Sequence, residues 1–191
     1  AVDDKIYVTL KKQAEINVLD AATGETIRKL PNTKGTEKIL YNQDVLVLQR
    51  KSGKPNAVST IQGTDPLSGE VLWKIEENSV VPQSIASRGD RVYFHNTHGI
   101  IAVDLKSGEG LWNSSLEGSG EFQWGNSGKL VATNRVVLFQ NTRHMVALST
   151  ENGELLWKGP GAQNSNPSVF VTQGLVWSGR PEYLNRKLDR S

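Results

Sequence analysis

A nine-residue pattern recurs along this chain and constrains its fold more than any other feature. In every copy a small polar residue is followed by Gly and then by Glu. The copies are Asp20–Arg28, Asp65–Trp73, Asp104–Trp112 and Ser149–Trp157. Their glycines are spaced 45, 39 and 45 residues apart. Self-similarity at such a period indicates a repeat architecture, a solenoid or a propeller.

Each copy has the pattern of a β-hairpin. The short polar side chains can accept hydrogen bonds from nearby backbone, and Gly supplies the positive φ of a tight turn. Apolar residues alternate or run together on both sides of the turn, as in Ile100–Val103 and Met145–Leu148. Two such runs around a short Gly turn predict two antiparallel strands.

A Trp ends three of the four copies at one fixed position on the second strand. We expect Trp73, Trp112 and Trp157 to be largely buried between successive repeats and to serve stability rather than ligand binding. The first copy departs from this pattern, because Arg28 stands where the others have the ring.

Two further strands precede each hairpin. One set is strongly apolar: 5–8, 44–48, 91–94, 135–139 and 174–177. The other set is shorter: 39–40, 84–86, 130–132 and 169–171. Four short strands in a period of about 40–45 residues match one propeller blade. The sequence therefore predicts an all-β fold, a β-propeller of four-stranded antiparallel blades, present as a partial propeller of about four to five blades.

The two ends of the repeat pattern predict that the chain is part of a larger propeller. The strand at 5–8 matches the second strand of a blade, and only four residues precede it. The strands at 169–171 and 174–177 match the first two strands of a fifth blade. Closing a four-bladed ring would leave one strand over, so we expect further blades or self-association to cover the exposed edges.

The repeats are expected to form one domain over residues 1–179, with residues 180–191 as a polar, basic tail or loop. The second repeat also carries an insertion around residues 50–56, which predicts a basic loop at a hairpin tip.

Composition excludes several kinds of site and partner. The chain has no Cys, so it can form neither a disulfide nor a thiolate metal site. Its 22 basic and 20 acidic residues are too evenly balanced to favour nucleic acid. No run of 18 apolar residues exists, so the sequence predicts no transmembrane segment.

The hairpin Asp-x-x-(Ser/Thr)-Gly-Glu-x-x-Trp, with a small residue before it at Ala102 and Ala147, resembles the pyrroloquinoline-quinone-type propeller repeat. Proteins with this repeat include quinoprotein alcohol dehydrogenases and a lipoprotein subunit of the bacterial outer-membrane assembly machinery. For the dehydrogenases the resemblance implies a quinone cofactor with calcium, a catalytic Asp and often a disulfide of adjacent cysteines. The disulfide is excluded here, and no calcium or catalytic residue can be matched, so we expect no cofactor.

The candidate binding residues lie in two connections between repeats. Gln123 and Trp124 precede the third of the short apolar strands, and the ring lies outside the Trp column. Asn164 and Asn166 occupy the corresponding connection before the fourth. These side chains could contact a protein or a small polar ligand at one propeller face, or they could be ordinary packing and loop residues.

Two other motifs were considered as functional sites and match less well. His95 and His98 are three residues apart, but with no third ligand nearby the interpretation is turn chemistry rather than a metal site. Gly118–Gly125 lacks the Gly-Lys-Ser/Thr ending of a phosphate loop. We therefore predict no catalytic residue and no metal ligand.

The leading functional hypothesis is a non-catalytic ligand- or protein-binding scaffold, exported and bacterial by resemblance, in the periplasm or outside the cell. One alternative is part of a quinoprotein-like oxidoreductase whose active site lies in blades beyond this sequence. Another is an accessory domain fused to an unrelated enzyme. Fold resemblance alone does not distinguish them.

Overall fold

The computed structural model describes residues 2–51, 58–77, 80–96, 98–115, 128–141, 144–161, 168–172 and 175–179. Within these residues it contains seventeen strands and no helix. The strands form five antiparallel sheets that follow one another along the chain. We call these sheets blades 1 to 5.

Blade 1 has three strands, β1 (Lys5–Val8), β2 (Ile16–Asp20) and β3 (Thr26–Leu30). Blade 2 contains β4 (Thr36–Asn42), β5 (Val45–Lys51), β6 (Ser59–Thr64) and β7 (Val71–Glu77). Blade 3 contains β8 (Val80–Arg88), β9 (Arg91–Asn96), β10 (Gly99–Asp104) and β11 (Gly110–Ser115). Blade 4 contains β12 (Lys129–Ala132), β13 (Val136–Gln140), β14 (His144–Ser149) and β15 (Leu155–Pro160). Blade 5 contains only β16 (Ser168–Thr172) and β17 (Leu175–Gly179).

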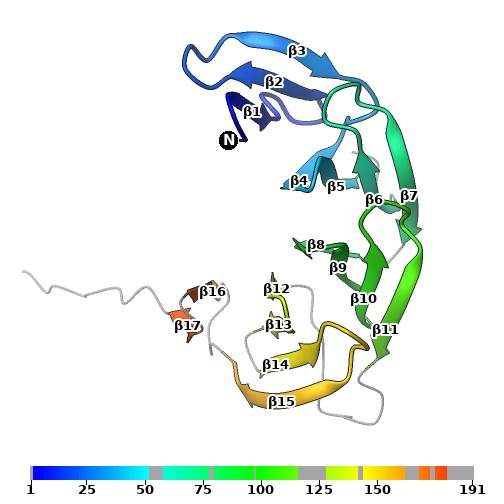
Figure 1. Cartoon of the computed structure of the whole chain (residues 1–191), viewed down its shortest axis with the longest axis vertical. Helices are drawn as coiled ribbons and strands as arrows, with labels where there is room; N and C mark the ends of the chain where they lie inside the picture. The colour runs from blue at the N-terminus through cyan, green and yellow to red at the C-terminus, as the bar shows by residue number, and fades with distance from the viewer. Residues whose placement is uncertain are drawn as a thin grey trace, which may run out of the picture.

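The blades are arranged around an open arc, with β4, β8, β12 and β16 at the inner edge and β7, β11 and β15 at the rim (Figure 1). This arrangement confirms the predicted all-β propeller of four-stranded antiparallel blades, present as a partial ring. Among the described residues blade 1 has three strands, whereas blades 2 to 4 have four each. The predicted strand positions agree with the observed ones because alternating apolar residues fix which strand faces pack.

The hydrophobic cores lie between successive blades rather than within one. Val18 and Leu30 of blade 1 pack with Leu46 and Leu48 of blade 2. The next core joins blades 2 and 3 and includes Val47, Ile61, Trp73, Val92 and Phe94. The third joins blades 3 and 4 and includes Tyr93, Ala102, Leu130, Phe139 and Val146. Each blade is therefore stabilised chiefly by its neighbours, as in other repeat folds.

The turn between the two outer strands is built as its sequence predicts. In blade 3 the Asp104 carboxylate accepts hydrogen bonds from the backbone N–H groups of Ser107 and Lys106, at 2.7 and 2.9 Å. These bonds, led by the one from Ser107, lower the pKa of Asp104. Gly108 closes the turn with a φ of 72°, a conformation in which a side chain would be strained.

The outer hairpins join one blade to the next through a contact that recurs along the arc. The Trp73 ring lies over the Gly108 turn of the following blade, and its indole N–H donates to the Leu105 carbonyl at 2.7 Å. Trp112 repeats this contact on the Gly153 turn of blade 4 and donates to the Thr150 carbonyl at 3.0 Å. We call this contact the ring-on-turn contact.

Arg28 makes the same connection without a ring. Its guanidinium donates to the Pro66 carbonyl at 3.1 Å, and Pro66 holds in blade 2 the place that Leu105 holds in blade 3. Pro31 covers the Gly69 turn in place of an indole. The polar half of the ring-on-turn contact is thus kept at the first interface, while its apolar half comes from a different residue.

One of the three Trp predictions was wrong. Trp73 is 7% exposed and Trp112 is half-buried, as expected for rings between blades, but Trp157 is 42% exposed. Burial of the ring requires the outer turn of the next blade. Among the described residues blade 5 supplies only β16 and β17, which correspond to the two inner strands.

Two sequence predictions lie outside the described residues. The tip of the insertion in the second repeat, residues 52–57, is one, and the tail, residues 180–191, is the other. The division into a propeller at 1–179 and a tail at 180–191 therefore stays a prediction.

Candidate functional site

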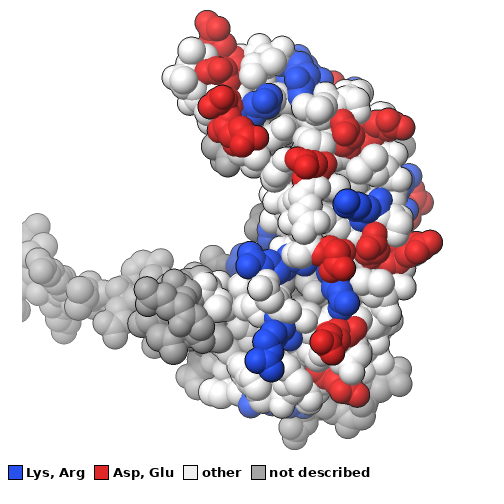
Figure 2. Space-filling model, in the orientation of Figure 1, with Lys and Arg blue, Asp and Glu red and all other residues white. Residues whose placement is uncertain are grey.

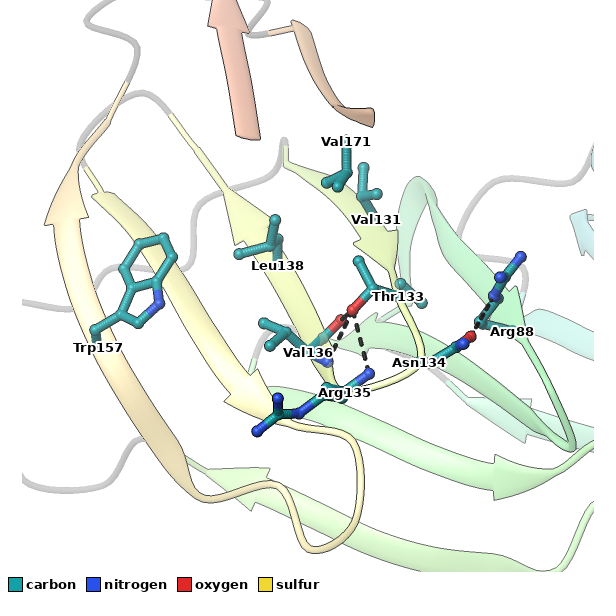
Figure 3. Close-up of a pocket in the computed structure, with 10 residues that line it drawn as sticks. Arg88, Val131, Thr133, Asn134, Arg135, Val136, Leu138, Trp157 and Val171 are labelled. Atoms are coloured by element: carbon teal, nitrogen blue, oxygen red, sulfur yellow. Dashed lines mark hydrogen bonds between the residues drawn. The ribbon is translucent and has the colours of Figure 1, made fainter. Parts of the chain in front are cut away.

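A depression lies around the turn between β12 and β13, where blades 3 and 4 meet. Three adjoining cavities of about 580, 310 and 320 Å³ share Asn134 as a lining residue. We define the turn groove as the polar part of this depression, formed by Arg88, Arg91, Asn134, Arg135 and Glu151. Figure 3 shows Arg88, Asn134 and Arg135 at one end of the largest cavity and apolar side chains along the rest of it.

Thr133 shapes the turn that carries the groove. Its hydroxyl oxygen accepts hydrogen bonds from the N–H groups of Arg135 and Val136, at 3.3 and 2.9 Å. Its hydroxyl also donates to the Val136 carbonyl at 3.1 Å. A Thr that bonds its own following backbone in this way stabilises a tight turn. The turn therefore holds Asn134 and Arg135 in a defined position.

Side chains of blade 3 fix the other side of the groove. Arg88 Nε donates to Asn134 Oδ1 at 2.7 Å, across a blade boundary. Arg91 donates to the carbonyls of Thr150 and Glu151 in the outer turn of blade 4. These bonds preorganise the groove, because guanidinium groups held by carbonyls lose less freedom when a partner binds.

The groove has mixed charge. Arg91 Nε lies 3.5 Å from the Asp90 carboxylate, and Glu151 lines the two smaller cavities. On the visible face of the arc, acidic residues gather at the N-terminal end, and elsewhere Lys and Arg are interspersed with Asp and Glu (Figure 2). A mixed, open surface of guanidinium, amide and carboxylate groups suits hydrogen bonding to another protein better than enclosure of a metabolite.

The apolar part of the largest cavity has a different character. Val131, Val136, Leu138 and Trp157 line it from blade 4, and Val171 lines it from β16. Between blades 2 and 3, the positions that correspond to Val136, Leu138 and Trp157 carry Val45, Val47 and Trp73, all buried in a core. We call the four blade 4 residues the end face, because their equivalents pack against a following blade.

The predicted binding residues Gln123, Trp124, Asn164 and Asn166 all lie outside the described residues. Their role in contacting a protein or a polar ligand stays a prediction. The turn groove is a separate candidate, and sequence reasoning missed it. Its first and last residues, Arg88 and Glu151, are 63 positions apart in the chain. No single stretch of sequence signals it.

The two histidines are placed differently by the fold. His95 lies on β9, fully buried, and its ring packs at a tilt of 46° against Phe139 of blade 4, with 4.6 Å between the ring centroids. Burial lowers the pKa of His95 to about 3, so that the imidazole is neutral at physiological pH. His98 lies in the turn that follows, where its backbone N–H donates to the Asn96 side-chain oxygen at 2.9 Å. The fold therefore places His95 in the core between blades 3 and 4 and His98 in a turn.

The described residues do not fit the quinone and calcium that the resemblance implies for dehydrogenases. They contain no group of three or more His, Cys, Asp or Glu that could hold a metal ion. The carboxylates of the outer turns, such as Asp65 and Asp104, accept hydrogen bonds within their own turns. The donor set needed for a calcium-bound quinone is therefore not assembled in this part of the chain.

Comparison with known proteins supports one family. The family model for outer membrane protein assembly factor BamB matches residues 1–187. No curated protein gives a significant match. Within the described residues there is no candidate membrane-crossing helix.

Solved structures resemble this chain in fold. The computationally designed protein Ika8 superposes on 94% of this chain with a TM-score of 0.72 at 19% identity, over 53% of its own length. BamB from Moraxella catarrhalis covers 82% of this chain with a TM-score of 0.54 at 20% identity, over 45% of its own length. A quinohemoprotein alcohol dehydrogenase from Pseudomonas putida covers 93% of it with a TM-score of 0.63 at 12% identity, over 37% of its own length. The chain thus spans about half the length of the first two.

Proposed function

This chain belongs to the family of outer membrane protein assembly factor BamB, and we propose that it is a non-catalytic protein-binding scaffold that takes part in assembling outer-membrane proteins. The match over residues 1–187 carries the proposal. We place the protein in the periplasm, or outside the cell, because that is where an outer-membrane assembly factor would work. The expected partner is a protein component of outer-membrane assembly.

The turn groove supports this function as the proposed contact surface. The guanidinium groups of Arg88 and Arg91 are fixed by hydrogen bonds between blades, so little of their freedom is lost on binding. Arg is enriched where proteins bind each other, because its planar group makes several hydrogen bonds at once. Gln123, Trp124, Asn164 and Asn166 are proposed as a second, independent contact.

Binding of the chain to a purified outer-membrane assembly complex that lacks its own BamB-type subunit tests the proposal. The double change Arg88→Glu and Arg135→Glu should weaken the complex by about tenfold or more, since it reverses two charges in the contact. The control is Lys74→Glu on β7, where an exposed lysine pairs with Glu76 away from the groove. Equal loss from both variants, or no binding by the unchanged chain, would contradict the proposal.

The alternative, part of a quinoprotein-like oxidoreductase, is favoured by the structural likeness to the alcohol dehydrogenase. Calorimetric titration with pyrroloquinoline quinone and calcium separates the two functions. We expect no tight binding and no dye reduction with an alcohol. A dissociation constant near or below about 1 µM, a free energy of about −8 kcal/mol, would support the oxidoreductase instead.

A further inference from the structure

A second depression lies between blades 1 and 2, and basic residues line most of it. Two cavities of about 510 and 330 Å³ share Lys34 as a lining residue. We call the two cavities together the basic cleft, and their charged lining residues are Lys11, Glu15, Lys29, Lys34, Arg50, Lys51 and Glu76. The cleft lies at the connections β1–β2, β3–β4 and β5–β6, whereas the turn groove lies at β12–β13 and β14–β15. Because neighbouring strands are antiparallel, these two sets of connections lie at opposite ends of the blades.

Hydrogen bonds hold the basic cleft in a defined shape. The side-chain amide of Gln13 in blade 1 donates to the Lys51 carbonyl of blade 2 at 3.1 Å. Arg50 Nε donates to the Lys34 carbonyl at 3.0 Å, and Arg50 Nη1 donates to the side-chain oxygen of Gln62 at 2.5 Å. Gln62 is itself fully buried. The guanidinium and the two lysine backbones are therefore preorganised for a partner.

Arg50 occupies a position that has a different use in the next two blades. The strand pairing places Asn96 and Asn141 there in blades 3 and 4. Both are buried, and each accepts a backbone N–H of its own turn at 2.8 Å, from Gly99 and from His144. In blade 2 a cation replaces this turn-forming residue, so the repeat fold by itself does not require it.

The cations of the cleft have no carboxylate partners in the part of the chain that the structure describes. None of the five basic lining residues forms an ion pair there, and Glu76 is already paired with Lys74, which lines neither cavity. Arg50 is half-buried, and burial lowers the pKa of its guanidinium, although this group stays protonated. A half-buried charge without a counter-charge costs desolvation free energy, which a bound carboxylate would offset.

Exposed apolar side chains lie among these cations. Leu10, which is 58% exposed, lines the smaller cavity, and Val58, which is 39% exposed, lines the larger one. We propose that the basic cleft binds an acidic segment of another protein, with carboxylates against the cations and apolar side chains against Leu10 and Val58. The segment spans both cavities and so crosses from blade 1 to blade 2. This protein need not belong to the outer-membrane assembly complex.

Other anionic partners fit the basic cleft less well. Nucleic acid is attracted by a strong positive field, whereas the chain has 22 basic and 20 acidic residues. An anionic membrane attracts clusters of basic residues that reach its surface, whereas Arg50 is half-buried in a cavity. A metabolite would be enclosed on most sides, but both cavities are open to solvent.

Fluorescence anisotropy with a labelled synthetic peptide, in which Leu is interspersed among Glu and Asp, tests the proposal. We expect a dissociation constant of about 100 µM or tighter at about 150 mM salt. The matched peptide with Gln and Asn in place of the acids should bind at least about tenfold more weakly. Equal binding of the two peptides, or binding of neither, overturns the proposal. So does binding to phosphatidylglycerol vesicles by a chain that leaves the acidic peptide free, which would assign the cleft to a membrane.

Charge reversals locate the contact. Lys34→Glu, where the two cavities meet, and Lys11→Glu, at the blade 1 end, should each raise the dissociation constant of the acidic peptide by about tenfold. The matched control Lys106→Glu reverses an exposed lysine in the outer turn of blade 3 and should change it by less than about twofold. All three side chains are exposed, so the melting midpoint should stay unchanged. Equal effects of all three would overturn the cleft as the site, and an effect of Lys34→Glu alone would overturn a segment that spans both cavities.

Discussion

The three Trp rings of the outer hairpins should differ sharply in their contribution to stability. Trp73 is 7% exposed, packs in the core between blades 2 and 3 and donates to the Leu105 carbonyl at 2.7 Å. Replacing a buried Trp by Ala costs about 3–5 kcal/mol. We therefore expect Trp73→Ala to lower the free energy of unfolding by about 4 kcal/mol, or the melting midpoint by roughly 8–16 °C for a chain of this size.

Trp157→Ala is the internal control. Trp157 ends the same Gly-Glu-x-x-Trp motif, but its ring is 42% exposed and no described blade covers its outer side. We expect a loss of about 1 kcal/mol or less, within the range of surface changes. Urea unfolding followed by far-ultraviolet circular dichroism, at a protein concentration where the chain is single, measures both variants. Equal losses would refute the argument that the ring acts through the next blade's turn.

Three further predictions concern the turns and the buried histidine. Gly108→Ala should destabilise the chain more than Gly89→Ala in thermal unfolding, because both have positive φ but only the former would push a Cβ against a Trp ring; equal midpoints would contradict this. Because His95 has a pKa of about 3 when folded against 6.5 as its ordinary value, the unfolded chain binds the extra proton between these pH values. The free energy of unfolding should therefore fall by about 1.4 kcal/mol per pH unit as pH drops through this window, a slope that His95→Gln removes and His98→Gln keeps. The Asp104 carboxyl should titrate below its usual 3.8 by carbon NMR, so that its contribution to stability is present above that pH and is lost as pH falls through the lower folded value. A midpoint at or above 3.8 would contradict the hydrogen-bonded turn.

The repeat could be predicted from sequence because its signals are local. The Gly of each outer turn, such as Gly108 with its φ of 72°, marks a conformation that other residues rarely adopt. The apolar runs then fix the strands on either side, since a slip of one residue would expose the core face. Hence the all-β fold and the order of four antiparallel strands within a blade were predicted correctly, although the innermost strands β4 and β8 are longer than predicted.

What the sequence did not show depends on contacts between blades. The exposure of Trp157 depends on what packs on it, although Trp157 ends the same Gly-Glu-x-x-Trp motif as Trp73. Arg28 looks like a lost docking residue, yet it donates to the Pro66 carbonyl and keeps the polar half of the contact. Its role becomes visible only when the next blade is placed beside it.

A buried polar row was also missed. Gln49, His95 and Gln140 hold the same position on the second strand of blades 2, 3 and 4, and each is at most 1% exposed. Gln49 shows one use of the row, because its amide N–H donates to the Val81 carbonyl of the next blade at 2.9 Å. The alternation of side chains along a strand predicts which ones are buried, but it does not predict hydrogen bonds from these side chains to a neighbouring sheet.

Cross-linking from defined positions tests the proposed function most directly. A photo-reactive amino acid is placed at position 135 in the turn groove or at position 74 on β7, and the chain is mixed with a purified outer-membrane assembly complex. The account predicts that position 135 cross-links to a protein of that complex and position 74 does not. Cross-linking that is equal from both positions, or absent from position 135 while the chain binds, would contradict the turn groove as the contact. A chain that neither binds nor cross-links would contradict the scaffold itself.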